Sequence, residues 1–157
     1  MNALLWNLIL ALAWVAATGR FSFNNLLVGF AMGFLVLFFS RRVVGSPNYF
    51  VKVRQVVGLI LFFIWELILA NLRVAYDVIT PRHRMRPGVI AIPLEAKTDI
   101  EITILSNLIT LTPGTLSLDV SADRRVLYIH AMYIDDIDDV RRKIKNGFER
   151  RVLEVLR

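Results

Sequence analysis

Long apolar runs fill the first half of the chain, and shorter periodic patterns fill the second half. The runs lie at about residues 3–18, 26–40 and 56–80 and are separated by polar or turn-forming residues. At 1.5 Å per residue the first two form helices of about 23–25 Å, shorter than the roughly 30 Å hydrocarbon core of a bilayer, whereas the third reaches roughly 35 Å. Residues 1–80 are therefore predicted to form a membrane domain of three helices, of which the third spans. The first two either cross a thinned bilayer or form a hairpin that does not fully cross.

After a basic linker at residues 81–87, the pattern predicts a small soluble α+β domain over residues 88–157. The expected elements are a strand at 88–94, a helix after the capping-box sequence Thr98-Asp99-Ile100-Glu101, a hairpin of strands 116–120 and 126–131, and a C-terminal amphipathic helix. The acids of that last helix precede its bases, which complements a helix dipole. The predicted order is β-α-β-β-α.

Three ionisable residues interrupt the third apolar run. At about 100° per residue, Glu66, Arg73 and Asp77 fall within roughly 40° of one another on one helix face. Arg73 and Asp77 are also spaced to pair directly. Glu66 lies near mid-span, where a lipid-exposed carboxylate is costly, so we expect it to face protein or water. The stripe is either a proton or cation relay or an assembly contact with another subunit's helix. We favour the assembly contact, because a single carboxylate makes a poor relay.

The second run contains the pair Gly29 and Gly33, a Gly-x-x-x-Gly spacing. Such a pair permits close contact between two helices, but ordinary membrane glycines show the same spacing. Both interpretations stay open from the sequence. The first run is not expected to be cleaved as a signal peptide, because no Lys or Arg precedes it and a second apolar run follows at once.

Composition supports a membrane protein. The 157 residues are 56% hydrophobic with a net charge of +6 and no cysteine, which excludes disulfides and thiol chemistry. The bases gather beside the apolar runs, so anionic headgroups are a better match for them than nucleic acid. Arg82, Arg84 and Arg86 are expected to anchor the chain at the membrane surface. Because a folded domain follows them, we predict that the C-terminal domain is cytoplasmic and, with three full crossings, that the N-terminus is outside.

Catalytic and metal-binding patterns are missing from the sequence. The acidic segment 135–139 lacks the glycine and terminal glutamate of a calcium loop, and a helix start explains it better than a cation site. Neither a nucleophile elbow nor a phosphate loop is present. We therefore predict no enzyme activity, no cofactor and no metal site.

The layout of a short apolar pair, a third helix and a C-terminal domain resembles the E subunits of multisubunit Mrp/Mnh-type sodium/proton antiporters. The resemblance is carried by Thr110-Leu111-Thr112-Pro113-Gly114-Thr115-Leu116 and by the strand pair 116–120 and 126–130, joined by Ser121-Ala122-Asp123-Arg124-Arg125. It extends over almost the whole chain. Within it, Thr112, Pro113, Gly114 and Thr115 are expected to cap a helix and set a turn, which is a structural role.

The resemblance implies an accessory, non-catalytic subunit in the cell membrane, which supports assembly and the membrane environment of the ion path. Its partners would be large antiporter-like subunits, other small membrane subunits and the lipid bilayer. The alternative is a free-standing membrane-anchored adaptor whose cytoplasmic domain binds a soluble partner or anionic lipid. The charged stripe on the third run favours intramembrane partners over a lone anchor.

Overall fold

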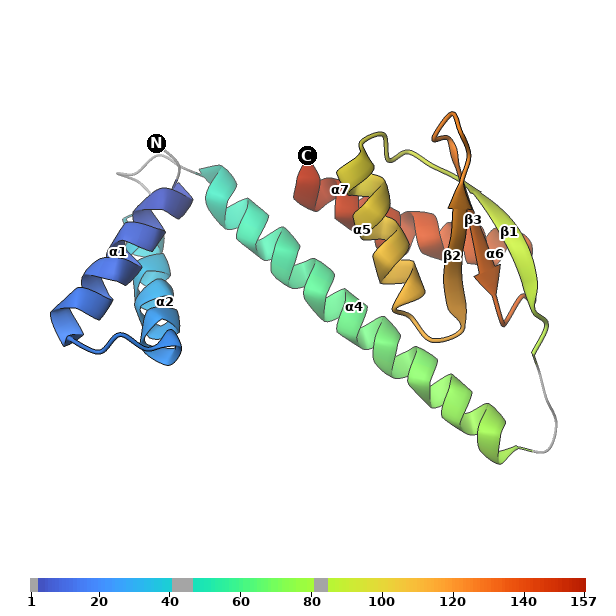
Figure 1. Ribbon diagram of the computed structural model, residues 1–157, viewed down its shortest axis with the longest axis horizontal. Coiled ribbons are helices and arrows are strands. Elements are labelled where there is room, and N and C mark those ends of the chain that lie inside the picture. Colours follow the sequence, from blue (N-terminus) through green and yellow to red (C-terminus); the bar gives the residue numbers. More distant parts are fainter. Residues whose placement is uncertain (1–2, 41–46, 81–84) are drawn as a thin grey trace. The chain divides into compact units, whose positions relative to one another are not determined.

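The computed structural model describes residues 3–40, 47–80 and 85–157. Within it the chain forms two compact units, Met1–Arg54 and Gln55–Arg157. Figure 1 follows the chain from the N-terminal helices, in blue, to the C-terminal helices, in red.

Two antiparallel helices, α1 (Ala3–Thr18) and α2 (Phe23–Phe39), form the first unit together with the start of α4. Gly19 ends the first helix with a positive φ of 65°, which glycine adopts at little cost. Ser22 caps the second helix by accepting a hydrogen bond from the backbone N–H of Asn25 at 3.2 Å. The turn between the two apolar runs is thus built from the polar residues that separate them.

The Gly-x-x-x-Gly pair lies at the contact between α1 and α2. A Cβ atom on Gly29 would come within 2.9 Å of the carbonyl oxygen of Ala11, and one on Gly33 would collide with the side chain of Asn7. Only glycine leaves room for this approach, so the close-contact interpretation of the pair is confirmed.

The third helix, α4 (Pro47–Ile79), starts earlier than its apolar run. It begins at Pro47 rather than near residue 56, because proline suits the first turn of a helix and the residues that follow it include good helix formers. The segment Tyr49–Ile79 is long and apolar enough to cross a membrane, by length and composition alone. The helices α1 and α2 are apolar but shorter.

After α4, the second unit continues with the predicted β-α-β-β-α order. Its elements are β1 (Gly88–Pro93), α5 (Asp99–Thr110), β2 (Thr115–Val120), β3 (Val126–Ala131) and a C-terminal helical segment. That last segment is divided into α6 (Ile137–Lys143), a π-helical turn η1 (Ile144–Glu149) and α7 (Arg150–Leu156). The strands form an antiparallel sheet in the order β1-β3-β2, with a bulge in β2 between Ser117 and Asp119.

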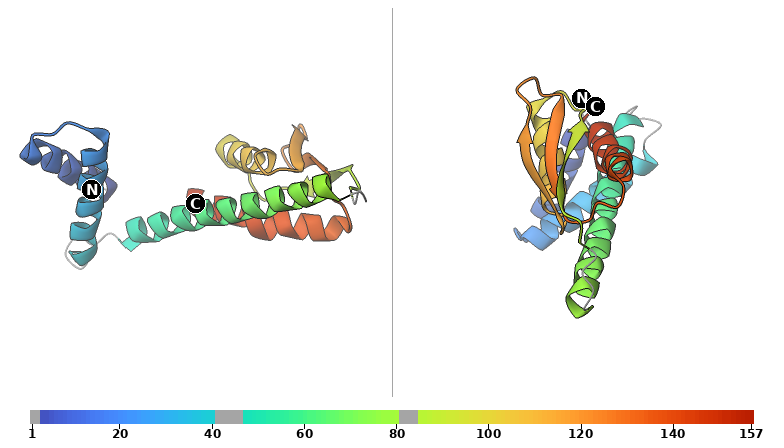
Figure 2. Two further views of the ribbon diagram at one scale, coloured as in Figure 1. Left: turned by 90° about the horizontal axis from the view of Figure 1, so that it is seen from below. Right: turned by 90° about the vertical axis from the view of Figure 1, so that its right-hand side faces the viewer.

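The helices of the domain cover one face of the sheet and close its hydrophobic core (Figure 2). The buried members of the core are Ile90, Ile92, Leu105, Ile109, Leu127, Ile129, Ile144 and Phe148. Because side chains alternate along a strand, the other face of the sheet carries exposed residues such as Val89 and Tyr128. The predicted capping box also forms: Thr98 and Glu101 bond to each other's backbone N–H groups at the start of α5.

Candidate functional site

The Thr-Pro-Gly-Thr segment forms the turn between α5 and β2. The hydroxyl of Thr112 donates to the carbonyl of Leu108 at 2.9 Å, and the hydroxyl of Thr115 donates to the carbonyl of Ile109 at 2.6 Å. These bonds satisfy carbonyl groups that the end of a helix leaves without intrahelical partners. Gly114 takes a positive φ of 88°, which allows the chain to reverse into the strand.

The same turn lies against the ring of Tyr133. A Cβ atom on Gly114 would lie 3.3 Å from Cε2 of Tyr133, and the carbonyl of Gly114 accepts a hydrogen bond from the backbone N–H of Met132 at 2.8 Å. The missing side chain at Gly114 therefore leaves room for the ring. In this way the motif helps to fix the position of Tyr133.

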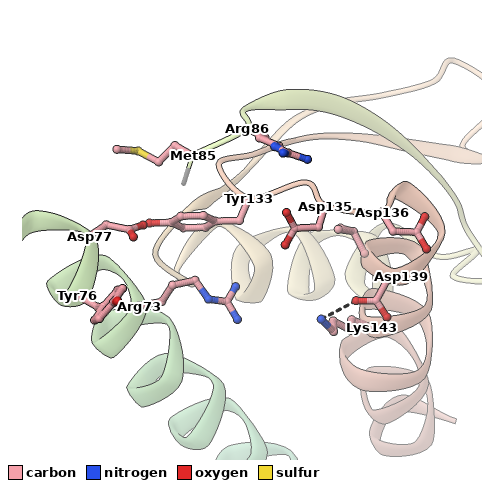
Figure 3. Close-up of a pocket in the computed structure, with 11 residues that line it drawn as sticks. Arg73, Tyr76, Asp77, Met85, Arg86, Tyr133, Asp135, Asp136, Asp139 and Lys143 are labelled. Carbon is pink, nitrogen blue, oxygen red and sulfur yellow. Dashed lines mark ion pairs between the residues drawn. The ribbon is translucent and has the colours of Figure 1, made fainter. Parts of the chain in front are cut away.

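The other side of Tyr133 meets helix α4. The guanidinium carbon of Arg73 lies 5.5 Å from the centre of the Tyr133 ring, within the range of a cation–π contact. Figure 3 shows the carboxylate of Asp77 next to the hydroxyl end of the same ring. We call the group of Arg73, Asp77, Gly114 and Tyr133 the Tyr133 junction, because it connects α4 to the domain.

The acidic member of the junction, Asp77, is only 5% exposed. The Asp77 carboxylate raises the pKa of the Tyr133 hydroxyl, and partial burial of the ring adds to this shift. Within the described part of the chain, neither the Tyr133 hydroxyl nor Oδ2 of Asp77 makes a hydrogen bond of ordinary geometry. Two buried polar atoms thus face each other, and whether they form a hydrogen bond depends on how closely α4 approaches the domain.

A cavity of about 590 Å³ opens beside the junction (Figure 3). Its ionisable lining residues, tyrosines aside, carry both signs of charge: Arg73, Asp77, Arg86, Asp135, Asp136, Asp139 and Lys143. Some of these charges are already paired, since Nζ of Lys143 lies 2.6 Å from a carboxylate oxygen of Asp139. Among the described residues, no group of three or more His, Asp or Glu side chains is arranged to hold a metal ion. The cavity is therefore a mixed-charge hollow with no arranged set of ligands.

The residues predicted from the sequence are distributed unevenly around this site. Arg73 and Asp77 both face the domain, although no ion pair joins them among the described residues. Glu66 is half-buried on the same side of α4. Arg86 is exposed, and its backbone bonds to Met132 and Ile134. Arg82 and Arg84 lie outside the described residues.

Tyr133 is the member of the junction that sequence reasoning did not find. It follows the last strand in an irregular segment, where no periodic pattern indicates which way a side chain points. Its two charged neighbours are more than fifty positions earlier in the sequence, so only the fold brings them together.

Comparison with known proteins places this architecture in a class. A family model described as Na+/H+ ion antiporter subunit matches residues 7–155. The E subunit of a Na(+)/H(+) antiporter from Bacillus subtilis is 42% identical over 154 residues, which covers 98% of each chain. The chain with a helical half and a small α+β domain is thus similar in sequence to subunits of Na+/H+ antiporters.

Chains of two solved membrane complexes are also similar to this chain. A chain in the structure of the Mrp complex from Dietzia sp. DQ12-45-1b is 30% identical, with a TM-score of 0.50, over 65% of this chain and 96% of that chain. A chain of the membrane-bound sulfane sulfur reductase, an archaeal respiratory membrane complex, is 25% identical with a TM-score of 0.56 and 96% coverage of both chains. This chain belongs to the family of Na+/H+ ion antiporter subunits.

Proposed function

We propose that the chain is an accessory, non-catalytic subunit of a multisubunit sodium/proton antiporter, located in the cell membrane. Its partners are the other subunits of that complex and the lipid bilayer. Its task is to support assembly and the membrane environment of the ion path. The C-terminal domain lies on the cytoplasmic side, as the bases after α4 favour.

One observation carries the non-catalytic part of this proposal. The charged side chains Arg73 and Asp77 of α4 face Tyr133 of the chain's own domain. A proton or cation relay needs a succession of ionisable groups along a path through the membrane. Here Arg73 and Asp77 instead lie against Tyr133 of the chain's own domain, which is an arrangement that supports structure.

The surface of the N-terminal unit supports the membrane part of the proposal. Large apolar side chains on α1 and α2 point away from the helix contact, among them Leu12, Phe23 and Phe39, which are 61%, 73% and 82% exposed. A water-exposed surface of this kind is unfavourable. Lipid or the helices of other subunits would cover it.

The proposal is tested by isolating the tagged chain from its native membrane in mild detergent and identifying the proteins that accompany it. We expect large antiporter-like subunits together with several small membrane subunits. Recovery of the chain alone, or with one soluble protein, would instead establish a membrane-anchored adaptor and overturn the proposal.

The accessory role has a separate test in transport. If Glu66 only contributes to structure, Glu66→Gln leaves sodium/proton exchange in membrane vesicles within about twofold of the wild type once the complex has assembled. A loss of exchange of a hundredfold or more in a fully assembled complex would place Glu66 in an ion path.

A further inference from the structure

Helix α4 has two faces of different character from Gln55 onward. One face meets the C-terminal domain at two places along the helix. At the first, Phe62 packs edge-on against Phe148 with ring centres 5.2 Å apart, and the guanidinium of Arg151 lies 3.9 Å from the centre of the Phe62 ring. The second place is the Tyr133 junction at Arg73 and Asp77.

The opposite face of α4 is apolar and exposed. At 100° per residue it is formed by Val57, Leu61, Ile64, Ile68, Leu72 and Ile79, with Trp65 at its border. The exposed fractions of Leu61, Leu72 and Ile79 are 61%, 62% and 80%. No Asp, Glu, Lys or Arg from residue 55 to residue 79 falls on this face. We call this surface the outer face of α4.

The domain contacts leave too little of α4 free to cross a bilayer. The contacts from Phe62 to Asp77 cover about 22 Å of helix, and the preceding part, from Pro47 to Leu61, is also about 22 Å long. A crossing requires roughly 30 Å of apolar helix. The preceding part moreover contains Lys52 and Arg54. A crossing helix would therefore carry part of the domain's charged surface into the hydrocarbon, because the domain is attached along its side.

We propose that α4 lies in the plane of the membrane, with its outer face buried in one leaflet and the C-terminal domain held above it on the headgroup side. In-plane amphipathic helices have this distribution of apolar and polar faces. The inference rests on the proposed membrane location of the chain. It replaces the expectation that the third apolar run spans, and it returns the chain to the side of the membrane on which α4 began.

The chemistry of the outer face matches lipid better than another helix. Membrane helices that pack closely use small residues, as Gly29 and Gly33 do against α1. The outer face of α4 consists instead of large Leu, Ile and Val side chains, with Trp65 at the border, where interfacial tryptophans are common. Bases lie near both ends of the helix, at Lys52 and Arg54 and at Arg86, where they complement anionic headgroups.

Because this chain has no cysteine, each single-cysteine variant adds one labelling site to it, and membranes carrying the cysteine-free chain give the background signal from other proteins. Nitroxide labels are placed on the outer face with Leu61→Cys, Ile68→Cys and Leu72→Cys, and on the domain side with Ala70→Cys as the matched control. The intact complex stays in its native membrane. Collision with oxygen, which concentrates in lipid, is then compared with collision with a water-soluble nickel chelate, and the ratio gives the depth of each label.

An in-plane helix gives the three outer labels similar depths in one leaflet and a lower oxygen-to-nickel ratio at Ala70→Cys. A crossing helix would separate the labels at residues 61 and 72 by about 16 Å in depth. Labels shielded from both oxygen and nickel would show that a protein partner covers the outer face. Either of the last two results overturns the inference, while the composition of the isolated complex still tests the proposed function independently.

The sides of the membrane provide a second readout. With an impermeant thiol reagent, Arg54→Cys and Asp138→Cys are labelled from the same side if α4 lies in the plane. Labelling from opposite sides would show that α4 crosses and would overturn the inference. Both residues are exposed, so neither substitution disturbs the packing of the chain.

Discussion

The helical hairpin of the first unit and the α+β domain of the second are built in opposite ways. Between α1 and α2 the buried residues are mainly small or polar, including Ala3, Asn7, Ala11, Gly29 and Gly33, and the large apolar side chains point outward. In the domain, large apolar side chains fill the interior and charged groups cover much of the surface. The hairpin thus has the apolar exterior that suits lipid, and the domain has the charged exterior that suits water.

The difference shows which forces hold each unit together. The domain gains stability by removing apolar area from water. The hairpin gains little in this way if its outside is lipid, and it relies on close approach of backbones. Substitutions that add side-chain volume should therefore destabilise the hairpin most. Substitutions that remove the partner of a buried polar group should destabilise the domain most.

The largest effect is expected at a buried acid of the domain. Glu149 is 2% exposed, and its carboxylate accepts hydrogen bonds from the backbone N–H groups of Glu95 and Ala96 at 2.6 and 3.0 Å. It also lies 3.3 Å from Nζ of Lys145. Glu149→Leu removes the acceptor of both backbone N–H groups, whereas Lys145 keeps its contacts with the Glu95 carboxylate at 2.9 Å and the Pro93 carbonyl at 3.0 Å. Two buried donors without an acceptor should reduce the free energy of unfolding by about 2–6 kcal/mol. Urea unfolding of the full chain in detergent, followed by hydrogen exchange in β1, measures this loss.

The matched control is Glu154→Leu, which makes the same exchange at an exposed ion pair with Arg150. Its cost should stay within about 1 kcal/mol. Equal losses of unfolding free energy in the two variants would mean that the buried hydrogen bonds of Glu149 add no stability. The domain would then not depend on polar pairing in its interior.

The hairpin should be most sensitive to added volume. Gly33→Leu places a side chain where Asn7 already lies, and overpacking of this kind costs about 1–3 kcal/mol. We expect α1 and α2 to separate and the yield of assembled complex to fall in detergent extracts. The control is Gly58→Leu in α4, where nothing lies within 4 Å of the new Cβ atom. If Gly33→Leu assembled as well as Gly58→Leu, close approach would not hold the hairpin together.

Much of the fold could be predicted from the sequence because local signals agree with one another. The three apolar helices, the capping box at Thr98 and Glu101 and the β-hairpin after Gly114 each rest on patterns within one continuous stretch of the chain. The start of α4 was misplaced, since the helix continues through polar residues that an apolar-run criterion leaves out. The π-helical turn η1 was also not predicted; it lies where Gly147 contacts Phe62 of α4, a contact that the local sequence does not indicate.

The site was predicted only in part for the same reason. The spacing of Arg73 and Asp77 put them correctly on one helix face, but it could not indicate what they face. Tyr133 of the same chain lies at this place in the structure, and the expected contact with a helix of another subunit stays a prediction. The contact with Tyr133 joins residues far apart in sequence, so it depends on the tertiary fold and leaves no local pattern.

The next effect in size concerns acid stability of the domain. The hydrogen bond from Arg157, with those from the backbone of Lys97 and Thr98, lowers the pKa of Glu101 from 4.5 to about 2. A carboxyl group with a lowered pKa in the folded state stabilises the fold above its unfolded pKa, and this contribution is lost as the pH falls from 4.5 towards 2. Glu101→Gln should therefore flatten the stability profile in that range. Hydrogen exchange in α5 at several pH values measures the slope, with Glu154→Gln as the control. A slope unchanged by Glu101→Gln would contradict the assignment.

The smallest and most local effect is expected where the apolar helix meets the water-exposed domain. The neighbouring Asp77 carboxylate raises the pKa of the Tyr133 hydroxyl from its usual 10.0. Below pH 10 the Tyr133 hydroxyl is protonated in the folded and the unfolded chain, and its contribution to the free energy of unfolding is complete. As the pH rises further, the hydroxyl of the unfolded chain loses its proton first, which favours unfolding and weakens the junction. The difference in tyrosinate absorbance between the wild-type chain and Tyr133→Phe should therefore titrate above pH 10, and Asp77→Asn should move that titration down. Titration of the Tyr133 hydroxyl at or below pH 10 in the wild-type chain would mean that α4 does not bring Asp77 to the domain. The change from an apolar exterior to a charged exterior would then lie at a different part of α4.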